Sequence, residues 1–386
     1  MRTGMRAVVR RVFEILASYG LGVAILFLLL LLTLFGTLEQ ANLGLYETQK
    51  KYFESWFLIH DLFGLVPIIL PGAYLLMGLL FINMLCGALV RARKDWRRPG
   101  MLIAHSGILF LLLSGFVTYH FSQTGHVTLF ETERSNEFES YHEWEIAIRQ
   151  DGSATQWIVP EEAFSDLAPG QERLLRSDSL PWDLRLKSFV KNSVPQAASS
   201  NEKAVDGFVL APLPTAKEAE QNVAGVYAEV IQKNGSQVHT GILWGQARAP
   251  WVVTMDGKTW AIDLQRKRWQ LPFTIALDKF TRELHPGTEI ARSFQSEVTK
   301  IEGGVNRKIR IRMNEPLRHR GYTFFQSGWG PEGAGPNTPL FSTLAVVKNP
   351  ADQWPKYACY IIALGLAIHF SQNLYRYLKL EQRQEL

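Results

Sequence analysis

Four long apolar runs constrain this chain more than any other feature of its sequence. They cover Leu16–Leu38, Ile68–Val90, Met101–Phe121 and Tyr357–Tyr375. The hydrocarbon core of a bilayer needs about 20 mostly apolar residues for one crossing helix, and each run is close to that length. The sequence therefore predicts a membrane protein with four transmembrane helices, three before and one after a large polar domain.

The basic residues lie beside some of these runs and avoid others. They gather before the first run, between the second and third, and after the fourth: Arg2, Arg6, Arg10, Arg11, Arg91, Arg93, Lys94, Arg97, Arg98, Arg376, Lys379 and Arg383. The link between the first two runs holds only Lys50 and Lys51. Because cytoplasmic loops are enriched in Lys and Arg, we expect both termini and the 91–100 loop in the cytoplasm. The net charge of +5 then reflects topology and predicts no nucleic-acid partner.

This topology also predicts the domain organisation. The chain divides into a cytoplasmic N-terminus, a membrane part with an outer interfacial loop and a basic cytoplasmic loop, an extracytoplasmic domain, a fourth helix and a cytoplasmic tail: 1–15, 16–121 with loops 39–67 and 91–100, 122–356, 357–375 and 376–386. The first run is longer than the apolar core of a signal peptide and lacks a small-residue cleavage site, so we expect it to be retained.

The extracytoplasmic domain is predicted to be mostly antiparallel β-structure, a sandwich or an open barrel. Lys308–Met313 alternates strictly, which places Ile309, Ile311 and Met313 on one buried face. Further strands are expected at His126–Thr132, Trp144–Ile148, Asp183–Val190, Val226–Ile231, Val238–Leu243, Tyr322–Gln326 and Ser342–Val347. The dipeptides Asp151-Gly152, Asn234-Gly235, Asp256-Gly257 and Gly303-Gly304 are typical of hairpin turns. Residues 192–221 are rich in Ala, Ser, Asn, Glu and Pro, which predicts a flexible insertion.

Two segments allow more than one interpretation. Leu45–Phe63 interleaves aromatic and charged residues, which is typical either of an amphipathic segment at the outer interface or of an ordinary ordered loop. Pro67 and Pro71 mark the entry into the second helix. In the segment Asn314–Trp329, Asn-Glu-Pro ends the strand Lys308–Met313 and opens a turn, Gly321 permits a second tight bend, and Tyr322–Gln326 starts another strand. On physical grounds alone the role of this segment is structural.

Histidines are the candidate functional residues. Ionisable groups inside a membrane span are costly and mark functional sites. His105 lies in the third run, roughly 7 Å from its cytoplasmic end, and His369 lies in the fourth, roughly 10 Å from the same side. Neutral imidazole is a ligand for haem iron and other transition metals. The alternative is a histidine that simply bonds a helix carbonyl. His60, His120 and His126 lie near the outer interface, where they could line a cofactor path or be merely solvated.

Other reaction classes lack support in the sequence. No H-E-x-x-H, G-x-S-x-G, P-loop or G-x-G-x-x-G pattern occurs, so neither a hydrolase nor a nucleotide-driven pump is indicated. The two cysteines, Cys86 and Cys359, lie in separate apolar runs, so the chain has no C-x-x-C redox or zinc motif.

Several short motifs resemble those of the ResB (CcsB) family of cytochrome c biogenesis proteins. Asn314–Leu317 reads Asn-Glu-Pro-Leu, and Gly321–Ser327 reads Gly-Tyr-Thr-Phe-Phe-Gln-Ser, with one more aromatic residue than the family pattern. Gly36–Gln40 resembles its G-T-x-x-Q element, and His105 with Gly107 resembles its intramembrane His-x-Gly element. The arrangement of three spans, a large outer domain and a final span is similar too, whereas residues 192–221 match poorly.

The resemblance implies a haem-handling or scaffold subunit of a cytochrome c maturation complex in a bacterial cytoplasmic (inner) membrane. Its partner would be a CcsA (ResC)-type membrane protein, and the pair would deliver haem across the membrane to apocytochrome c. His105 then becomes the candidate axial ligand of a transient haem, with the second ligand expected from the partner; His369 has weaker support. The tryptophans here are dispersed, so the ligation chemistry is expected in the partner, and this chain would be an accessory subunit.

Two other functions compete with this one. The first is a scaffold that binds no haem and docks apocytochrome c or a thiol reductant through its outer domain. The second is a transporter half or a sensor, which would need polar or broken helices along a substrate path. Apart from Asn83, Ser106 and Ser114, the apolar runs offer few polar residues of this kind.

Overall fold

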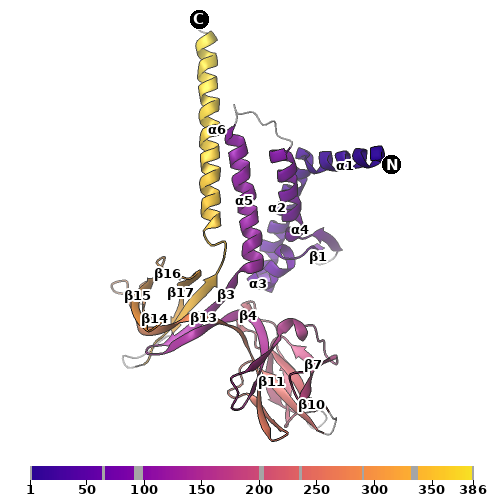
Figure 1. The fold of residues 1–386 in the computed structure, drawn as a ribbon, viewed down its shortest axis with the longest axis vertical. Helices are drawn as coiled ribbons and strands as arrows, with labels where there is room; N and C mark the ends of the chain where they lie inside the picture. The colour runs from indigo at the N-terminus through magenta and orange to yellow at the C-terminus, as the bar shows by residue number, and fades with distance from the viewer. Residues whose placement is uncertain are drawn as a thin grey trace. The chain divides into compact units, whose positions relative to one another are not determined.

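The computed structural model describes residues 2–62, 66–90, 99–199, 204–233, 237–288, 291–331 and 338–384. It divides the chain into two compact units, a helical unit of Met1–Gln123 with Lys348–Leu386 and a β unit of Thr124–Val347 (Figure 1). Most of the predicted basic loop (91–98) and the predicted Asn234-Gly235 turn lie outside the described residues.

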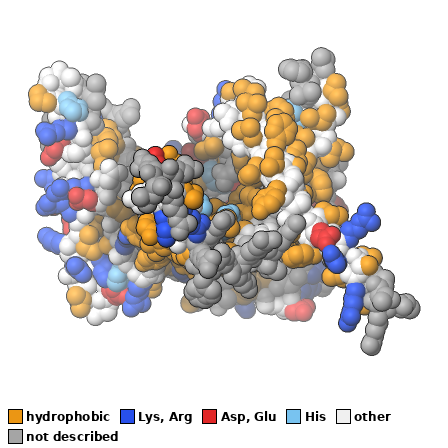
Figure 2. Space-filling view, turned by 90° about the horizontal axis from the view of Figure 1, so that it is seen from above, with side chains coloured by type: hydrophobic (Ala, Val, Ile, Leu, Met, Phe, Trp, Pro, Cys, Tyr) orange, Lys and Arg blue, Asp and Glu red, His pale blue; other side chains and the backbone are white. Residues whose placement is uncertain are grey.

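The helical unit contains six α-helices and two π-helical turns among the described residues. These are α1 (Arg2–Leu16), α2 (Tyr19–Leu43), α3 (Leu45–Thr48), η1 (Gln49–Phe53), α4 (Ala73–Met84), η2 (Leu85–Val90), α5 (Pro99–Phe121) and α6 (Trp354–Gln384). In the described part of the chain, three helices are long and apolar enough to cross a membrane: α2, α5 and Trp354–Gln382 of α6. Ala73–Leu89 forms a shorter apolar helix. Hydrophobic side chains accordingly cover broad areas of the face shown in Figure 2.

The first apolar run begins its crossing helix later than predicted. α1 ends at Leu16 and α2 begins at Tyr19, because Ser18 caps the new helix by accepting a hydrogen bond from the Leu21 amide at 3.2 Å. The side-chain amide of Asn83 on α4 donates to the carbonyl oxygens of Leu16 at 2.6 Å and Ser18 at 3.0 Å. Asn83, a buried polar residue of the second run, therefore bonds the backbone carbonyls at the break between α1 and α2, and this role is structural.

The second apolar run is only partly helical. Its first residues form β2 (Val66–Pro71), which pairs antiparallel with β1 (Phe57–Leu62). The prediction of a helix from Ile68 was therefore wrong at its start. Gly72 makes the turn into α4, where an added Cβ would lie 2.0 Å from the Ser55 carbonyl oxygen, so only glycine fits. The described residues of the preceding segment, Leu45–Leu62, include α3, η1 and β1, and Phe63 lies outside the described residues.

The β unit is built from antiparallel ladders. Its strands are β3 (Gln123–Phe130), β4 (Arg134–Gln150), β5 (Gln156–Pro160), β6 (Glu172–Leu175), β7 (Trp182–Val190), β8 (Ser193–Ala197), β9 (Phe208–Pro212), β10 (Gly225–Gln232), β11 (Val238–Trp244), β12 (Trp251–Met255), β13 (Lys258–Leu284), β14 (Ala291–Glu302), β15 (Val305–Arg312), β16 (Leu317–His319), β17 (Tyr322–Gly330) and β18 (Phe341–Lys348). The largest sheet runs β15-β14-β13-β4-β3-β18-β17-β16, with β12 on β13 and β5 on β4. A second sheet has the order β11-β10-β7-β6. The predicted antiparallel β domain is confirmed.

Two hydrophobic cores lie along the long strands β4 and β13. The first contains Trp144, Trp182 and Trp260, and the second contains Phe138 and Phe273. β13 contributes to both, because its 27 residues extend past the length of one core. The β unit thus has apolar cores of its own without a disulfide, and burial of aliphatic and aromatic side chains stabilises it.

The predicted position of the Asp256-Gly257 turn is confirmed, whereas the predicted end of the strand Lys308–Met313 is wrong. Asp256 and Gly257 have φ values of 53° and 71°, as a tight hairpin between β12 and β13 requires. However, β15 ends at Arg312, so Met313 is 52% exposed and not part of the buried face expected for it. Ile311 is fully buried as predicted. Residues 192–221 include the antiparallel β8–β9 hairpin.

Candidate functional site

The two helices that carry the intramembrane histidines pack through small residues. An added Cβ at Gly100 of α5 would lie 2.5 Å from the backbone nitrogen of His369 on α6. An added Cβ at Gly365 of α6 would lie 2.4 Å from the backbone nitrogen of Ala104. Since these atoms are backbone, they cannot move aside. The α5–α6 contact is therefore a backbone-to-backbone approach of the kind that small residues allow between helices in lipid.

His105 uses one ring nitrogen within its own helix. Its Nδ1 lies 2.7 Å from the carbonyl oxygen of Met101, one turn earlier. As carbonyl oxygen only accepts, Nδ1 carries the proton, and the lone pair of the neutral ring is on Nε2. Nε2 has no hydrogen-bonding partner among the residues that the structure describes. An Nδ1–H bonded to a carbonyl is the usual support for a histidine that binds metal through Nε2.

His369 differs in its partners. Its Nε2 lies 3.0 Å from the side-chain amide nitrogen of Asn373, which donates to it. Binding of a metal by that nitrogen would first require the loss of this bond. The backbone of His369 lies beside Gly100, whereas His105 is five residues further along α5, or roughly 7.5 Å. The sequence suggested similar depths, but the packing offsets the two histidines by more than one helical turn.

The side chains near His105 and His369 suit a single ligand to haem iron better than a complete metal site made of protein side chains. Within the described ranges, no group of three or more His, Cys, Asp or Glu residues could hold a metal ion. Haem needs only axial donors from protein because the porphyrin supplies the other four nitrogens. The neutral imidazole of His105, with Nε2 available, fits that requirement.

The other histidines near the membrane segments are engaged in local contacts. His60 stacks on Phe35, with ring centroids 4.5 Å apart, and its Nδ1 lies 2.6 Å from the hydroxyl of Tyr52. The same hydroxyl donates to the carboxylate of Glu39. His120 meets the hydroxyl of Tyr74 at 2.9 Å. Both histidines were named from the sequence without their partners, because folding of the 39–67 loop brings His60 to Tyr52, and packing of α4 beside α5 brings Tyr74 to His120.

Tyr52 is the centre of this cluster. It is fully buried, and burial together with its hydrogen bond to Glu39 raises the pKa of its phenol. Lys51 forms an ion pair with the other oxygen of Glu39 at 2.7 Å. These hydrogen bonds connect the end of α2 to η1 and β1. Within the cluster, the charges of Glu39 and Lys51 neutralise each other.

The β unit contains a second charged cluster, which joins β14 to the β16–β17 hairpin. Oε2 of Glu302 accepts from Lys300 at 2.8 Å and from His319 at 2.7 Å, and Arg320 forms an ion pair with the other oxygen at 2.7 Å. The bonds from Lys300 and then His319 lower the pKa of the Glu302 carboxyl to about 2. His319 and Arg320 belong to the motif-rich segment predicted as a strand-turn-strand unit, and the pairing of His319 with Tyr322 confirms that unit.

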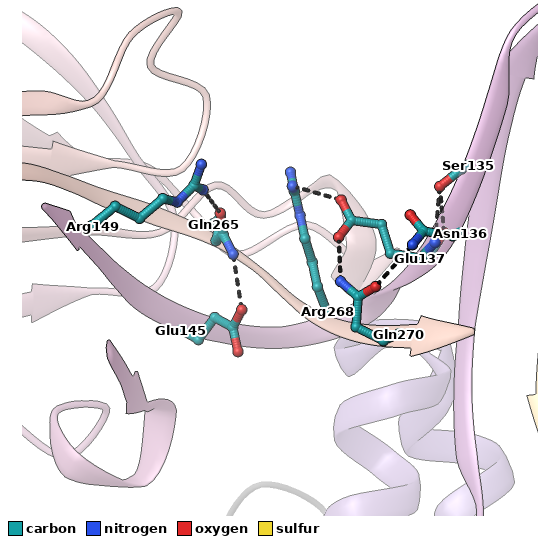
Figure 3. A network of polar contacts seen from close by, with 8 residues as sticks. All are labelled: Ser135, Asn136, Glu137, Glu145, Arg149, Gln265, Arg268 and Gln270. Atoms are coloured by element: carbon teal, nitrogen blue, oxygen red, sulfur yellow. Dashed lines mark hydrogen bonds and ion pairs between the residues drawn. The ribbon is translucent and has the colours of Figure 1, made fainter. Parts of the chain in front are cut away.

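A third network joins β4 to β13 where these strands pass from one core to the other (Figure 3). Its members are Ser135, Asn136, Glu137, Glu145, Arg149, Gln265, Arg268 and Gln270. The buried Gln265 donates to Glu145 at 2.9 Å, and Glu137 accepts from Arg268 at 3.0 Å. These bonds satisfy polar groups between two apolar cores, so we assign the network a structural role.

Comparison with protein families identifies one part of the chain. Residues 223–339 match the model of the ResB-like family. The matched region is ResB-like. It runs from β10 to β17, so it includes the Lys300–Glu302–His319 cluster and excludes α5 and α6. Among curated proteins, none matches the chain. The match confirms the ResB resemblance and includes the Asn314–Leu317 and Gly321–Ser327 motifs, whereas Gly36–Gln40 and His105 lie outside it; the family is one of cytochrome c biogenesis.

Proposed function

We propose that this chain is the haem-handling subunit of a cytochrome c maturation complex. The observation that carries the proposal is the ResB-like match of residues 223–339. In the proposed topology, both termini lie in the cytoplasm and the β unit lies outside a bacterial inner membrane. The support for this orientation is the distribution of arginine and lysine around the apolar helices.

His105 is the proposed haem ligand in this chain. The Met101 carbonyl fixes the tautomer of its ring, which leaves Nε2 as the donor atom toward iron. Haem held there would be the group that is joined to the two thiols of apocytochrome c. His369 is the weaker candidate, because its Nε2 is already bonded to Asn373. A CcsA (ResC)-type membrane partner would supply the second axial ligand and the ligation chemistry.

The proposal is tested with the complex of the full chain and its partner. The complex is purified in detergent, and the haem absorption spectrum is recorded for the wild type, His105→Gly and His120→Gly. His120 is a matched control on the same helix, paired with Tyr74. We expect His105→Gly to lose most of the haem or its low-spin spectrum, and added imidazole to restore it. His120→Gly should keep both.

The alternative function gives a different result. If haem content and spectrum are the same in His105→Gly and the wild type, the ligand role is wrong. The chain would then be a scaffold that docks apocytochrome c or a thiol reductant through its outer domain. Binding of an apocytochrome c peptide to the His105→Gly complex, measured in parallel, would support that scaffold.

A further inference from the structure

One face of the β1–β2 hairpin in the helical unit is apolar and exposed. In this two-stranded antiparallel sheet, Ile59 pairs with Ile69, and Phe57 pairs with Pro71. Residues that pair directly lie on the same face, and side chains two positions apart along a strand also share it. Phe57 is 65% exposed, Ile59 59% and Ile69 76%. Single exposed apolar residues are ordinary, but a contiguous apolar face marks an interaction surface.

The opposite face of the hairpin packs against the helices. Leu58 is 6% exposed and belongs to the apolar cluster of the helical unit, and its ladder partner Leu70 packs against the same cluster. His60, which is also on this face, contacts the ring of Phe35 and the hydroxyl of Tyr52. A two-stranded hairpin is marginally stable alone. One face therefore fixes the hairpin in the helical unit, and the other face is left to a partner.

The helix that follows the hairpin is short for a crossing helix. Ala73–Leu89 is about 25 Å long at 1.5 Å per residue, whereas the hydrocarbon core of a bilayer is about 30 Å thick. A bilayer accommodates a short crossing helix by becoming thinner around it. Residues just beyond the ends of such a helix then lie where acyl chains meet head groups. On the N-terminal side of α4, those residues belong to β2, which ends at Pro71.

Aromatic side chains mark the same level. Trp56 directly precedes β1 and meets Tyr74 on α4, with ring centroids 5.2 Å apart. Tyr74 in turn meets Tyr119 near the end of α5, with centroids 5.7 Å apart. Tryptophan and tyrosine are enriched at membrane–water interfaces, where their rings lie at the level of the head groups. The three rings therefore place the start of β1, the start of α4 and the end of α5 at one interface.

The backbone of the hairpin limits its depth. Each strand pairs only with the other in the described part of the chain, so each has one edge whose N–H and C=O groups make no ladder bonds. Such groups are not tolerated in hydrocarbon, but head groups and water can bond them at the interface. Asp61, two residues after Ile59 on the same face, is exposed and ends the apolar strip with a charge. The hairpin therefore suits the boundary of the hydrocarbon and not its middle.

We infer that the β1–β2 hairpin is an interfacial membrane anchor, with the face of Phe57, Ile59 and Ile69 immersed where acyl chains meet head groups. The partner is lipid because these three side chains have no polar atom to bond a protein surface, and because the aromatic rings beside them mark the interface. The inference rests on the crossing of the second apolar run in the proposed topology. It does not depend on haem binding.

The inference is tested on the full chain in vesicles of phosphatidylcholine and phosphatidylglycerol. Both native cysteines are replaced by alanine, and single cysteines are introduced and labelled with the fluorophore NBD. Ile69→Cys reports on the hairpin. Val252→Cys, at a position that is 56% exposed on β12, is the control in the β unit, and Leu113→Cys near the middle of α5 is the hydrocarbon control. Fluorescence is quenched by iodide in the water on both sides, or by lipids with a spin label near the head group or near the end of the acyl chain.

The label at Ile69 should respond mainly to lipid. We expect the spin label near the head group to quench it about twofold more than the one near the chain end, since an interfacial segment lies at the boundary between head groups and acyl chains. Iodide should quench it little. Ile59→Cys, directly opposite in the ladder, should give the same result. At Leu113 the order of the two lipid quenchers should reverse, and at Val252 only iodide should quench.

Three other results would overturn the inference. Quenching of Ile69→Cys by iodide, as at Val252, would place the face in water. Protection from iodide and from both lipids would mean that protein covers the face. Stronger quenching by the spin label near the chain end, as at Leu113, would place the hairpin in the hydrocarbon. The labelled chain with His105→Gly should give the same quenching, so a failure of the haem proposal and a failure of the anchor are read separately.

Discussion

The α5–α6 pair and the β4–β13 ladder solve the same packing problem with opposite residue types. The helices approach through Gly100, Ala104 and Gly365, where there is almost no side chain to bury. The ladder is covered by large aromatic residues such as Trp260 and Phe138, both nearly inaccessible to solvent. In lipid, burial of apolar surface between helices gains little, so close backbone contact stabilises the pair. In water, burial of aromatic surface is the dominant favourable contribution.

Their polar groups differ in the same way. On α5, Ser106 donates to the Leu102 carbonyl and His105 bonds the Met101 carbonyl, so these two polar side chains bond within their own helix. In the ladder, Gln265 and Glu145 bond across strands. This comparison teaches that a polar group on α5 can be satisfied locally and still present a second atom to a ligand, as His105 does with Nε2.

The largest expected effect on stability comes from a substitution in the hydrophobic core of the β unit. Trp260 is 2% exposed and meets Trp182 edge to face, with centroids 5.5 Å apart. Trp260→Ala should lower the free energy of unfolding of this unit by about 3–5 kcal/mol. Urea unfolding of the full chain, followed by circular dichroism at a β-sheet wavelength, measures it. Val252→Ala on β12, where the side chain is 56% exposed, should change it by about 0.5 kcal/mol or less. Similar losses in the two variants would contradict the assigned core.

The second largest effect on stability comes from a substitution at the contact between α5 and α6. Gly100→Ala places a methyl group against the backbone of α6 and should cost about 1–3 kcal/mol, through overpacking. Gly115→Ala is the matched control on α5, because nothing lies within 4 Å of its added Cβ. Both are Gly→Ala changes on α5, and the propensity gain is the larger at Gly115 in the helix interior, so a loss of stability at Gly100 reports the contact with α6. Thermal unfolding in detergent should show a lower midpoint for Gly100→Ala only. Equal midpoints would mean that α5 and α6 do not pack through Gly100.

The smallest effect concerns charge in the ResB-like region. Lys300 and His319 hold the pKa of Glu302 at about 2, below its ordinary value of 4.5. A carboxyl with a lowered folded-state pKa stabilises the fold above its unfolded pKa, and this contribution is lost as the pH falls from about 5 toward 2. The urea midpoint of the wild type should therefore fall more steeply below pH 5 than that of Glu302→Gln. Glu315→Gln, at an exposed turn position, should follow the wild type. Parallel slopes for Glu302→Gln and the wild type would show that the cluster does not affect stability.

The sequence determined a large part of this protein. Apolar run length predicted the helices, since a crossing helix must satisfy its backbone internally and needs a fixed length of apolar residues. Alternation and turn dipeptides predicted the antiparallel strands, as for Ile311 and the Asp256-Gly257 turn. Both patterns are local. Local patterns failed at boundaries, where Ser18 starts a new helix, Gly72 follows a hairpin and Met313 leaves its strand.

Only the tertiary structure decided which side chains meet. The sequence named His105 and, with weaker support, His369 as candidate haem ligands. Among the described residues, the Met101 carbonyl leaves Nε2 of His105 without a partner, whereas the Asn373 amide bonds Nε2 of His369. The sequence also named the G-T-x-x-Q element without a reason for it, and the fold places Gly36 of that element against Phe53 and Thr48, where an added Cβ would lie 3.4 Å and 3.6 Å from their side chains. The physical reason is the same in both cases. Hydrogen bonds and pockets depend on distances between atoms, and the chain fixes those distances only once its elements have packed.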